Sequence, residues 1–128
     1  MRLTTFVVQA GDPEVQCTVS IFPGDTGGVR ANISRWLRQL GLATDAASLD
    51  ATEAALQPIQ TAGGWTASWV DFRANAKKEN VPEALLGAIV PMEGQTLFVK
   101  LSGPLALLDA EADRVRGLIE SLAPGGER

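Results

Sequence analysis

The chain has 128 residues, the size of one domain, and its 45% hydrophobic and 20% charged residues are ordinary globular usage. It contains no histidine, which excludes Ser-His-Asp, Cys-His and histidine-based zinc chemistry. The formal net charge is −4 and the 11 Lys and Arg residues are scattered, so nucleic acid is not expected as a partner.

The first third of the chain predicts two strands and a helix. Leu3–Gln9 and Val15–Phe22 flank a Gly-Asp-Pro turn, and the second segment alternates apolar and polar residues, which indicates an antiparallel hairpin. Cys17 lies on the apolar side of that alternation and is expected in the core. After a glycine-rich run, apolar residues recur at helical spacing over Val29–Leu40, and Gly41 is expected to end the helix.

The middle of the chain predicts one hairpin between two loops. Thr44–Leu56 is expected to form a loop with one short helix. Pro58–Ala62 and Trp65–Arg73 flank Gly63-Gly64, a pattern typical of a hairpin. A polar loop over Ala74–Pro82 is expected to follow.

The last third predicts a second hairpin and a helix. Leu85–Val90 and Thr96–Ser102 are expected to pair across a longer loop at 91–95. Pro104 opens a C-terminal helix with an apolar stripe over Leu105–Leu122. The prediction is an α+β fold, an antiparallel sheet of about six strands flanked by helices, with one domain over 1–123 and a frayed tail over 124–128.

Three segments carry a resemblance to a known family. They are FPGDTGGVRANISRWLRQLGL at Phe22–Leu42, LLGAIVP at Leu85–Pro91 and TLFVKLSGPLALL at Thr96–Leu108. They resemble uncharacterised bacterial proteins, many exported or lipid-anchored, with a PsbP-like fold. The matching positions are Gly27, Gly28, Asn32, Arg35, Trp36, Gln39, Phe98, Lys100, Gly103 and Pro104. The chain departs from the family pattern at Ser34 and Leu37, where asparagine and arginine are common.

The resemblance implies an α/β/α sandwich and, by analogy of fold, a protein of binding or assembly. It also implies an extracytoplasmic location in the cell envelope, whereas a native start at Met1 would indicate the cytoplasm. No cofactor and no metal site are expected, because no cluster of Asp, Glu and Cys has ligand spacing. No transmembrane segment is expected, because the longest apolar run, Leu85–Met92, is too short.

The predicted first helix carries the first candidate site. Asn32, Arg35 and Gln39 share one ridge beside its apolar stripe, and Trp36 lies within the stripe as an expected core residue. The ridge is a candidate contact surface for a ligand or protein partner. The alternative is that Asn32 and Gln39 bond to nearby backbone and that Arg35 pairs with a carboxylate.

Three further features are candidate sites, each with a structural alternative. Gly27 and Gly28 precede the helix and are candidates for an anion-binding turn, or form a plain tight turn. Lys100 is a candidate for a functional amine. The structural alternative is that its ammonium extends to solvent or forms an ion pair. Trp65 and Trp69 share a strand face that is a partner patch if open and core if a helix covers it.

These residues support two hypotheses. The first is a non-enzymatic binding or assembly module for an unknown protein partner, using the candidate residues named above. The second is a small-molecule or anion sensor, or a small enzyme, that uses Lys100 with Asp25 or Asp71 near the glycine turn.

Overall fold

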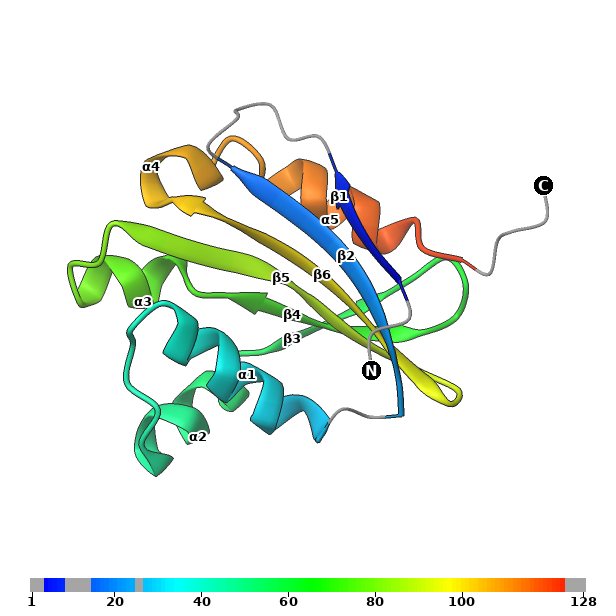
Figure 1. Ribbon diagram of the computed structural model, residues 1–128, viewed down its shortest axis with the longest axis horizontal. Coiled ribbons are helices and arrows are strands. Elements are labelled where there is room, and N and C mark those ends of the chain that lie inside the picture. Colours follow the sequence, from blue (N-terminus) through cyan, green and yellow to red (C-terminus); the bar gives the residue numbers. More distant parts are fainter. Residues whose placement is uncertain (1–3, 9–14, 25–26, 124–128) are drawn as a thin grey trace.

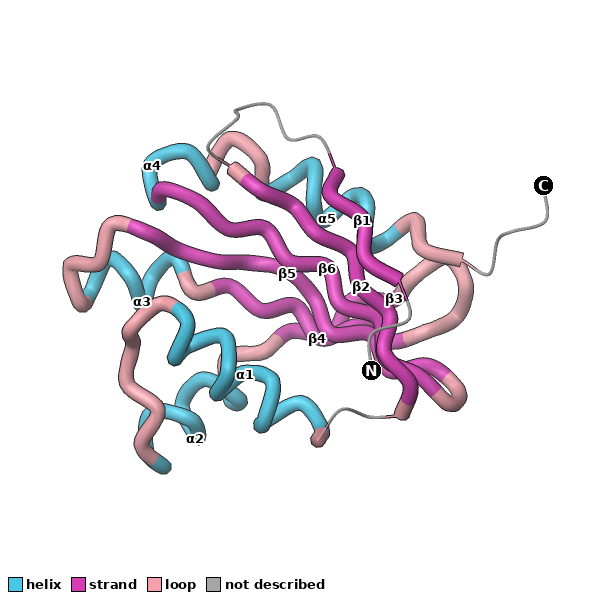
Figure 2. Tube along the Cα trace, in the orientation of Figure 1, coloured by secondary structure: helices cyan, strands magenta, loops and turns pink. Residues whose placement is uncertain are grey.

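Six antiparallel strands form one open sheet in the part of the chain that the computed structural model describes, residues 4–8, 15–24 and 27–123. The elements are β1 (Thr4–Val8), β2 (Gln16–Pro23), α1 (Gly28–Gln39), α2 (Ala46–Ala54), β3 (Gln57–Gln60), β4 (Thr66–Asp71), α3 (Arg73–Lys78), β5 (Glu83–Met92), β6 (Gln95–Pro104), α4 (Leu105–Leu108) and α5 (Ala112–Glu120). The strand order is β1-β2-β6-β5-β4-β3 (Figure 2). The predicted α+β fold class is confirmed; the turn predicted at Gly11–Pro13 and the tail at 124–128 lie outside the described residues.

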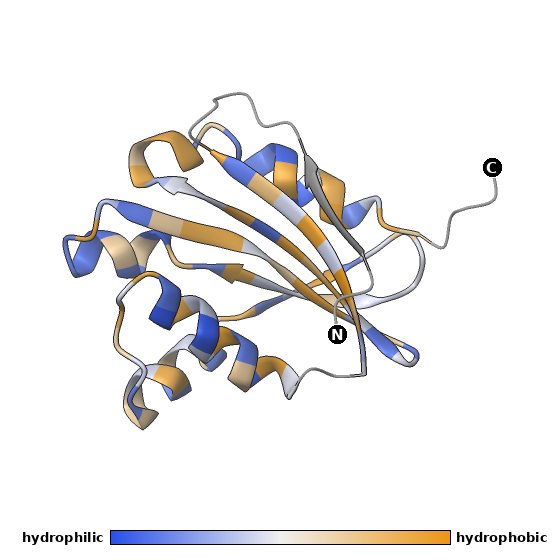
Figure 3. Ribbon diagram, in the orientation of Figure 1, coloured by the Kyte–Doolittle hydropathy of each residue, from blue (hydrophilic) through white to orange (hydrophobic). Residues whose placement is uncertain are grey.

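Each face of the sheet is covered by its own helices. Because side chains alternate along a strand, β5 directs Leu86 and Ala88 to one face and Leu85 and Ile89 to the other. The first, called the α5 face, packs against α4 and α5, and the second, the α1 face, packs against α1 and α2 (Figure 1). β5 is hydrophobic over most of its length, whereas α1 alternates hydrophobic and hydrophilic stretches (Figure 3).

The first helix ends just before Gly41, the residue that the sequence predicts as its stop. Gly41 has φ 78°, and its N–H donates to the Arg38 carbonyl at 3.0 Å. The N–H of Leu42 donates to the Leu37 carbonyl at 2.9 Å, which completes a Schellman motif. Leu37 and Leu42 are both buried in the same cluster, so the motif also fixes how the chain leaves the helix.

The expected polar loop at 74–82 contains a short helix, α3, and Arg73 begins that helix instead of ending β4. The cause lies in the carboxylate of Asp71. It accepts a hydrogen bond from the backbone N–H of Arg73 at 3.0 Å and another from the guanidinium of Arg73. These local bonds turn the chain away from the strand direction. Ala76 is the buried residue of α3. One buried residue in a six-residue helix produces no repeating apolar pattern, so the sequence did not predict this helix.

The longer loop expected at 91–95 is a two-residue turn between extended strands. Met92 pairs with Gln95, and Gly94 supplies the positive φ of 76° that the turn requires. Pro91 was expected to end the strand but lies within β5. It is tolerated there because the pairing of β4 with β5 ends at Ile89, so no ladder bond to β4 is lost.

The single C-terminal helix predicted after Pro104 is two helices, α4 and α5. The chain turns between them, and the N–H of Glu111 donates to the Leu108 carbonyl at 3.0 Å. Leu108, Val115 and Ile119 are all buried on the α5 face, as the stripe predicted. Helical spacing continues across the break, so the apolar stripe alone does not reveal it.

Two glycines in regular structure provide a matched test of the packing. A Cβ built on Gly87 in β5 would lie 1.9 Å from the backbone oxygen of Val99 in β6, whereas one on Gly117 in α5 meets nothing within 4 Å. We expect Gly87→Ala to lower the free energy of unfolding by about 3 kcal/mol because backbone must shift. We expect Gly117→Ala to raise it by roughly 0.5–1 kcal/mol, since alanine costs less in a helix.

Urea unfolding followed by circular dichroism measures both changes. An unfolding midpoint for Gly87→Ala equal to that of the unmodified protein would contradict the close approach of β5 and β6.

Candidate functional site

A half-covered region of the α1 face brings together residues of α1 and β6. We call it the α1–β6 seam and define it as Trp36, Gln39, Phe98 and Lys100. Trp36 and Gln39 are three residues apart on α1, and Phe98 and Lys100 are two apart on β6, so each pair projects to one side. In the view of Figure 1, α1 and α2 lie below the strands of the sheet, and neither overlaps β1 or β2.

Among the described residues, uncharged groups hold the Lys100 ammonium. Its Nζ donates to Gln39 Oε1 at 3.1 Å and lies 5.9 Å from the centre of the Trp36 ring. No carboxylate pairs with it among the described residues. Burial of the side chain lowers the pKa of Lys100, because the charged form loses water. The seam therefore contains a partly desolvated cation without a counter-ion in the described structure.

Aromatic rings fix the inner wall of the seam. Trp36 is 7% exposed and meets the ring of Phe98 edge to face at 6.0 Å between centroids. Phe98 in turn meets Phe22 of β2 at 5.6 Å. Trp36 is thus a core residue, as the helical stripe predicts, and the polar groups of the seam stand on a rigid apolar base.

The polar ridge of α1 divides into two parts. The amide of Asn32 donates from Nδ2 to the Gly28 carbonyl at 2.7 Å, and Arg35 Nη2 donates to Asn32 Oδ1 at 2.7 Å. Asn32 is 4% exposed, so this part of the ridge stabilises the helix from within. Gln39 instead reaches across to Lys100 on β6. Sequence spacing predicted the ridge but not this contact, which depends on how α1 crosses the sheet.

The glycine turn before α1 has left-handed backbone at both predicted positions. Gly27, the N-cap, has φ 94°, and Gly28 has φ 89°. Such angles favour glycine, which accounts for both residues in a tight turn. Asp25, which the enzyme hypothesis uses, lies outside the described residues. Anion binding at this turn stays a prediction.

The two strand tryptophans lie on the α5 face, away from the seam. Trp69 is 8% exposed, and the guanidinium carbon of Arg116 in α5 lies 5.6 Å from its ring centre. Trp65 is half-buried against the same cluster. The covering helix favours the core interpretation for Trp69.

Asp71 also belongs to the α5 face, because it pairs in register with Leu86, whereas Lys100 pairs with Gly87. The carboxylate of Asp71 is bound by Arg73 Nη2 at 2.7 Å. The structure therefore does not bring Asp71 together with Lys100, which removes one of the two pairings, with Asp25 or with Asp71, that the enzyme hypothesis offers.

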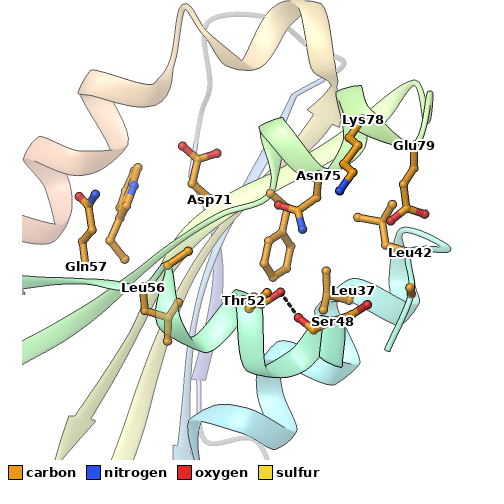
Figure 4. A pocket seen from close by; sticks show the side chains of 15 residues that line it. Leu37, Leu42, Ser48, Thr52, Leu56, Gln57, Asp71, Asn75, Lys78 and Glu79 are labelled. Carbon is orange, nitrogen blue, oxygen red and sulfur yellow. Dashed lines mark hydrogen bonds between the residues drawn. The ribbon is translucent and has the colours of Figure 1, made fainter. Parts of the chain in front are cut away.

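A cavity that the sequence did not reveal lies on the other side of α1. It has a volume of about 310 Å³ and opens between α2, α3 and the end of β4 (Figure 4). One pattern in the sequence could have indicated it: Ser48, Ala51 and Thr52 of α2 and Ala55 after it are small residues at helical spacing, and all four line the cavity.

Comparisons with known proteins give a likeness of fold. No family model matches the chain, and no curated protein matches its sequence. The chain is similar to the crystal structure of PA94 from Pseudomonas aeruginosa, described as a protein of unknown function and candidate regulator. Their TM-score is 0.52 at 14% identity, covering 97% of this chain and 83% of PA94. The resemblance to the PsbP-like family stays a prediction.

Within the described ranges, no helix has the length and apolar character needed to cross a bilayer. Across those same residues, no three of Cys, Asp and Glu gather as metal ligands would.

The pKa of Lys100 predicts a pH dependence of stability. Its folded-state pKa lies below the ordinary 10.5, so between these two values the unfolded state binds more protons. The free energy of unfolding should therefore rise with pH in that window, and Lys100→Gln should lack this rise. Burial, with Glu111 as a second cause, raises the pKa of Cys17 above 9.0 and acts in the opposite sense at high pH.

Urea unfolding of the unmodified protein and of Lys100→Gln from pH 7 to pH 10.5 isolates the contribution of Lys100, because Cys17 is present in both proteins. We expect the difference, unmodified protein minus variant, to grow with pH. A difference that stays constant over this range would show that Lys100 is fully hydrated.

Proposed function

We propose that the chain is a non-enzymatic binding module that takes an acidic group of a protein partner at the α1–β6 seam. The observation that carries this proposal is the half-buried Lys100 ammonium, whose contacts, Gln39 and Trp36, are both uncharged. Burial of an ammonium without a counter-ion costs free energy, and a carboxylate of a partner would recover part of it.

The charge of α1 supports an acidic partner. The helix carries Arg30, Arg35 and Arg38 and no acidic residue, although the whole chain has a net charge of −4. Arg30 is neutralised by Asp50 and Glu53 of α2. Arg38 makes its described hydrogen bond to the hydroxyl of Ser34 at 3.4 Å. Helix α1 is therefore more positive than the protein as a whole, which favours encounter with acidic surfaces.

The neighbouring strand supports a polar contact surface. On β2, Gln16, Thr18 and Ser20 share the α1 face with Lys100, since Thr18 pairs with Lys100 in register. Gln16 is exposed, and Thr18 and Ser20 are half-buried. A partner that places a carboxylate on Lys100 would thus meet hydroxyl and amide groups beside it, a composition typical of the rim of an interface.

Two labelled peptides of equal length, one of glutamate and one of glutamine, test the proposal by fluorescence anisotropy. We expect the glutamate peptide to bind more tightly, and Lys100→Gln to weaken it by about tenfold or more, since a charged hydrogen bond is lost. Lys77→Gln, which removes an exposed lysine of α3, is the matched control and should bind like the unmodified protein.

Equal affinity of the two peptides for the unmodified protein would rule out an acidic ligand at the seam. So would an equal loss of affinity for the glutamate peptide in Lys100→Gln and Lys77→Gln. The anion-sensor hypothesis makes a different prediction for the same proteins: free acetate at millimolar concentration would then displace the glutamate peptide.

A further inference from the structure

The cavity between α2, α3 and the end of β4 is a second candidate site, separate from the seam. Its volume of about 310 Å³ lies at the lower end of the range of ligand pockets, about 300–1,000 Å³. Figure 4 shows Leu56 and Gln57 toward one end and Leu42, Lys78 and Glu79 toward the other, with Thr52 between them.

The cavity exists because β3 is shorter than the strand it pairs with. The pairing of β3 with β4 begins at Gln57 and Trp69, so Val70 and Asp71 extend past it with no strand on their outer side. The helix α2 leads directly into β3 and lies over this gap. The space beyond the end of β3 is thus enclosed by helices.

Small side chains keep the cavity open. Ser48, Ala51 and Thr52 of α2 face it, and of the residues in α2 only Thr52 is buried. Opposite them, Leu37 of α1 and Phe72 after β4, each 1% exposed, supply an apolar wall. Such a space fits a small branched or aromatic side chain between the two walls.

Polar groups of α3 and of the residue after it lie at one end of the cavity; Gln57 and Asp71 also line the cavity, and the Asp71 carboxylate is paired with Arg73. Figure 4 shows Asn75, Lys78 and Glu79 with their polar ends directed toward α2. The Asn75 side chain is half-buried and makes no hydrogen bond with a described residue. Lys78 and Glu79 are exposed and form no ion pair within the described structure. This end of the cavity therefore offers one cation, one anion and one amide, none of them paired with a described residue.

From this arrangement we infer that the cavity binds a small zwitterion with an apolar side chain, of the class of a free aliphatic amino acid. The ligand carboxylate would meet Lys78 and the Asn75 amide, and the ligand ammonium would meet Glu79. The apolar side chain would lie between α2 and Phe72. Opposite charges side by side at the mouth favour a ligand that carries both, since an ion of either sign would meet one repulsive group.

The test uses three compounds with the same branched carbon chain. L-leucine carries both charges, 4-methylpentanoic acid lacks the ammonium, and 3-methylbutylamine lacks the carboxylate. Isothermal titration calorimetry with the full chain should give a Kd of about 1 mM or tighter for L-leucine. Each of the other two compounds should bind about fivefold more weakly or worse, because each loses an ionic contact.

Two pairs of variants locate the site. Ala51→Leu fills the cavity and should weaken L-leucine binding more than about tenfold, whereas Ala54→Leu on the same helix, outside the cavity lining, should not change it. Lys78→Gln should weaken binding about fivefold, and Lys77→Gln, whose side chain does not line the cavity, should have no effect.

Loss of binding in Ala51→Leu and Lys78→Gln but in neither control would support the proposal. Absence of L-leucine binding up to about 10 mM would overturn it, and so would equal binding of the three compounds. Binding that survives Ala51→Leu would place the ligand elsewhere and overturn the assignment to this cavity. Lys100→Gln should bind L-leucine normally, which separates this result from that of the seam.

Discussion

The fold depends on the pairing of β5 with β6 at the centre of the sheet. The two strands pair from Glu83 with Pro104 to Met92 with Gln95, and most of their side chains are buried on both faces. A central pair that is apolar on both sides must be covered twice, so a helical layer is required on each face. The absence of a side chain at Gly87 allows the close approach of the two backbones. Lys100 is the charged residue of β6, and it is half-buried beside α1.

The sequence predicted this architecture because its periods were long and regular. The alternation through Cys17 on β2 and the helical stripe through Trp36 both gave the correct faces. The prediction from sequence was wrong where a single local contact decides whether a helix begins or ends. The carboxylate of Asp71 turns the chain into α3 through bonds to Arg73, and a break after Leu108 divides the last helix without interrupting its spacing.

The candidate site was predictable in its parts but not in its assembly. Sequence spacing places Gln39 on the polar ridge of α1 and identifies Lys100 as a separate candidate amine, and the two residues lie far apart in the chain. Their contact at 3.1 Å depends on the angle and position of α1 on the sheet, which hydrophobic periodicity does not specify. The same limit explains the cavity, because its space depends on β3 stopping at Gln57 while β4 continues. A missing partner for one strand has no signature in that strand's own sequence.

Helix α1 borders both regions, and its packing bears on whether they act together. Ile33 and Leu37 are 0% and 1% exposed, and the Schellman motif at Gly41 closes the helix end, so α1 is held as a rigid body. Energetic coupling between two sites requires an element with two alternative arrangements. On the side of the cavity that element would be α2, which buries only Thr52 and is anchored to α1 by the ion pairs of Arg30. Because Gln39 and Trp36, the described contacts of the Lys100 ammonium, both belong to α1, a ligand that shifts α2 alone would leave the seam intact, and we expect the two regions to bind independently.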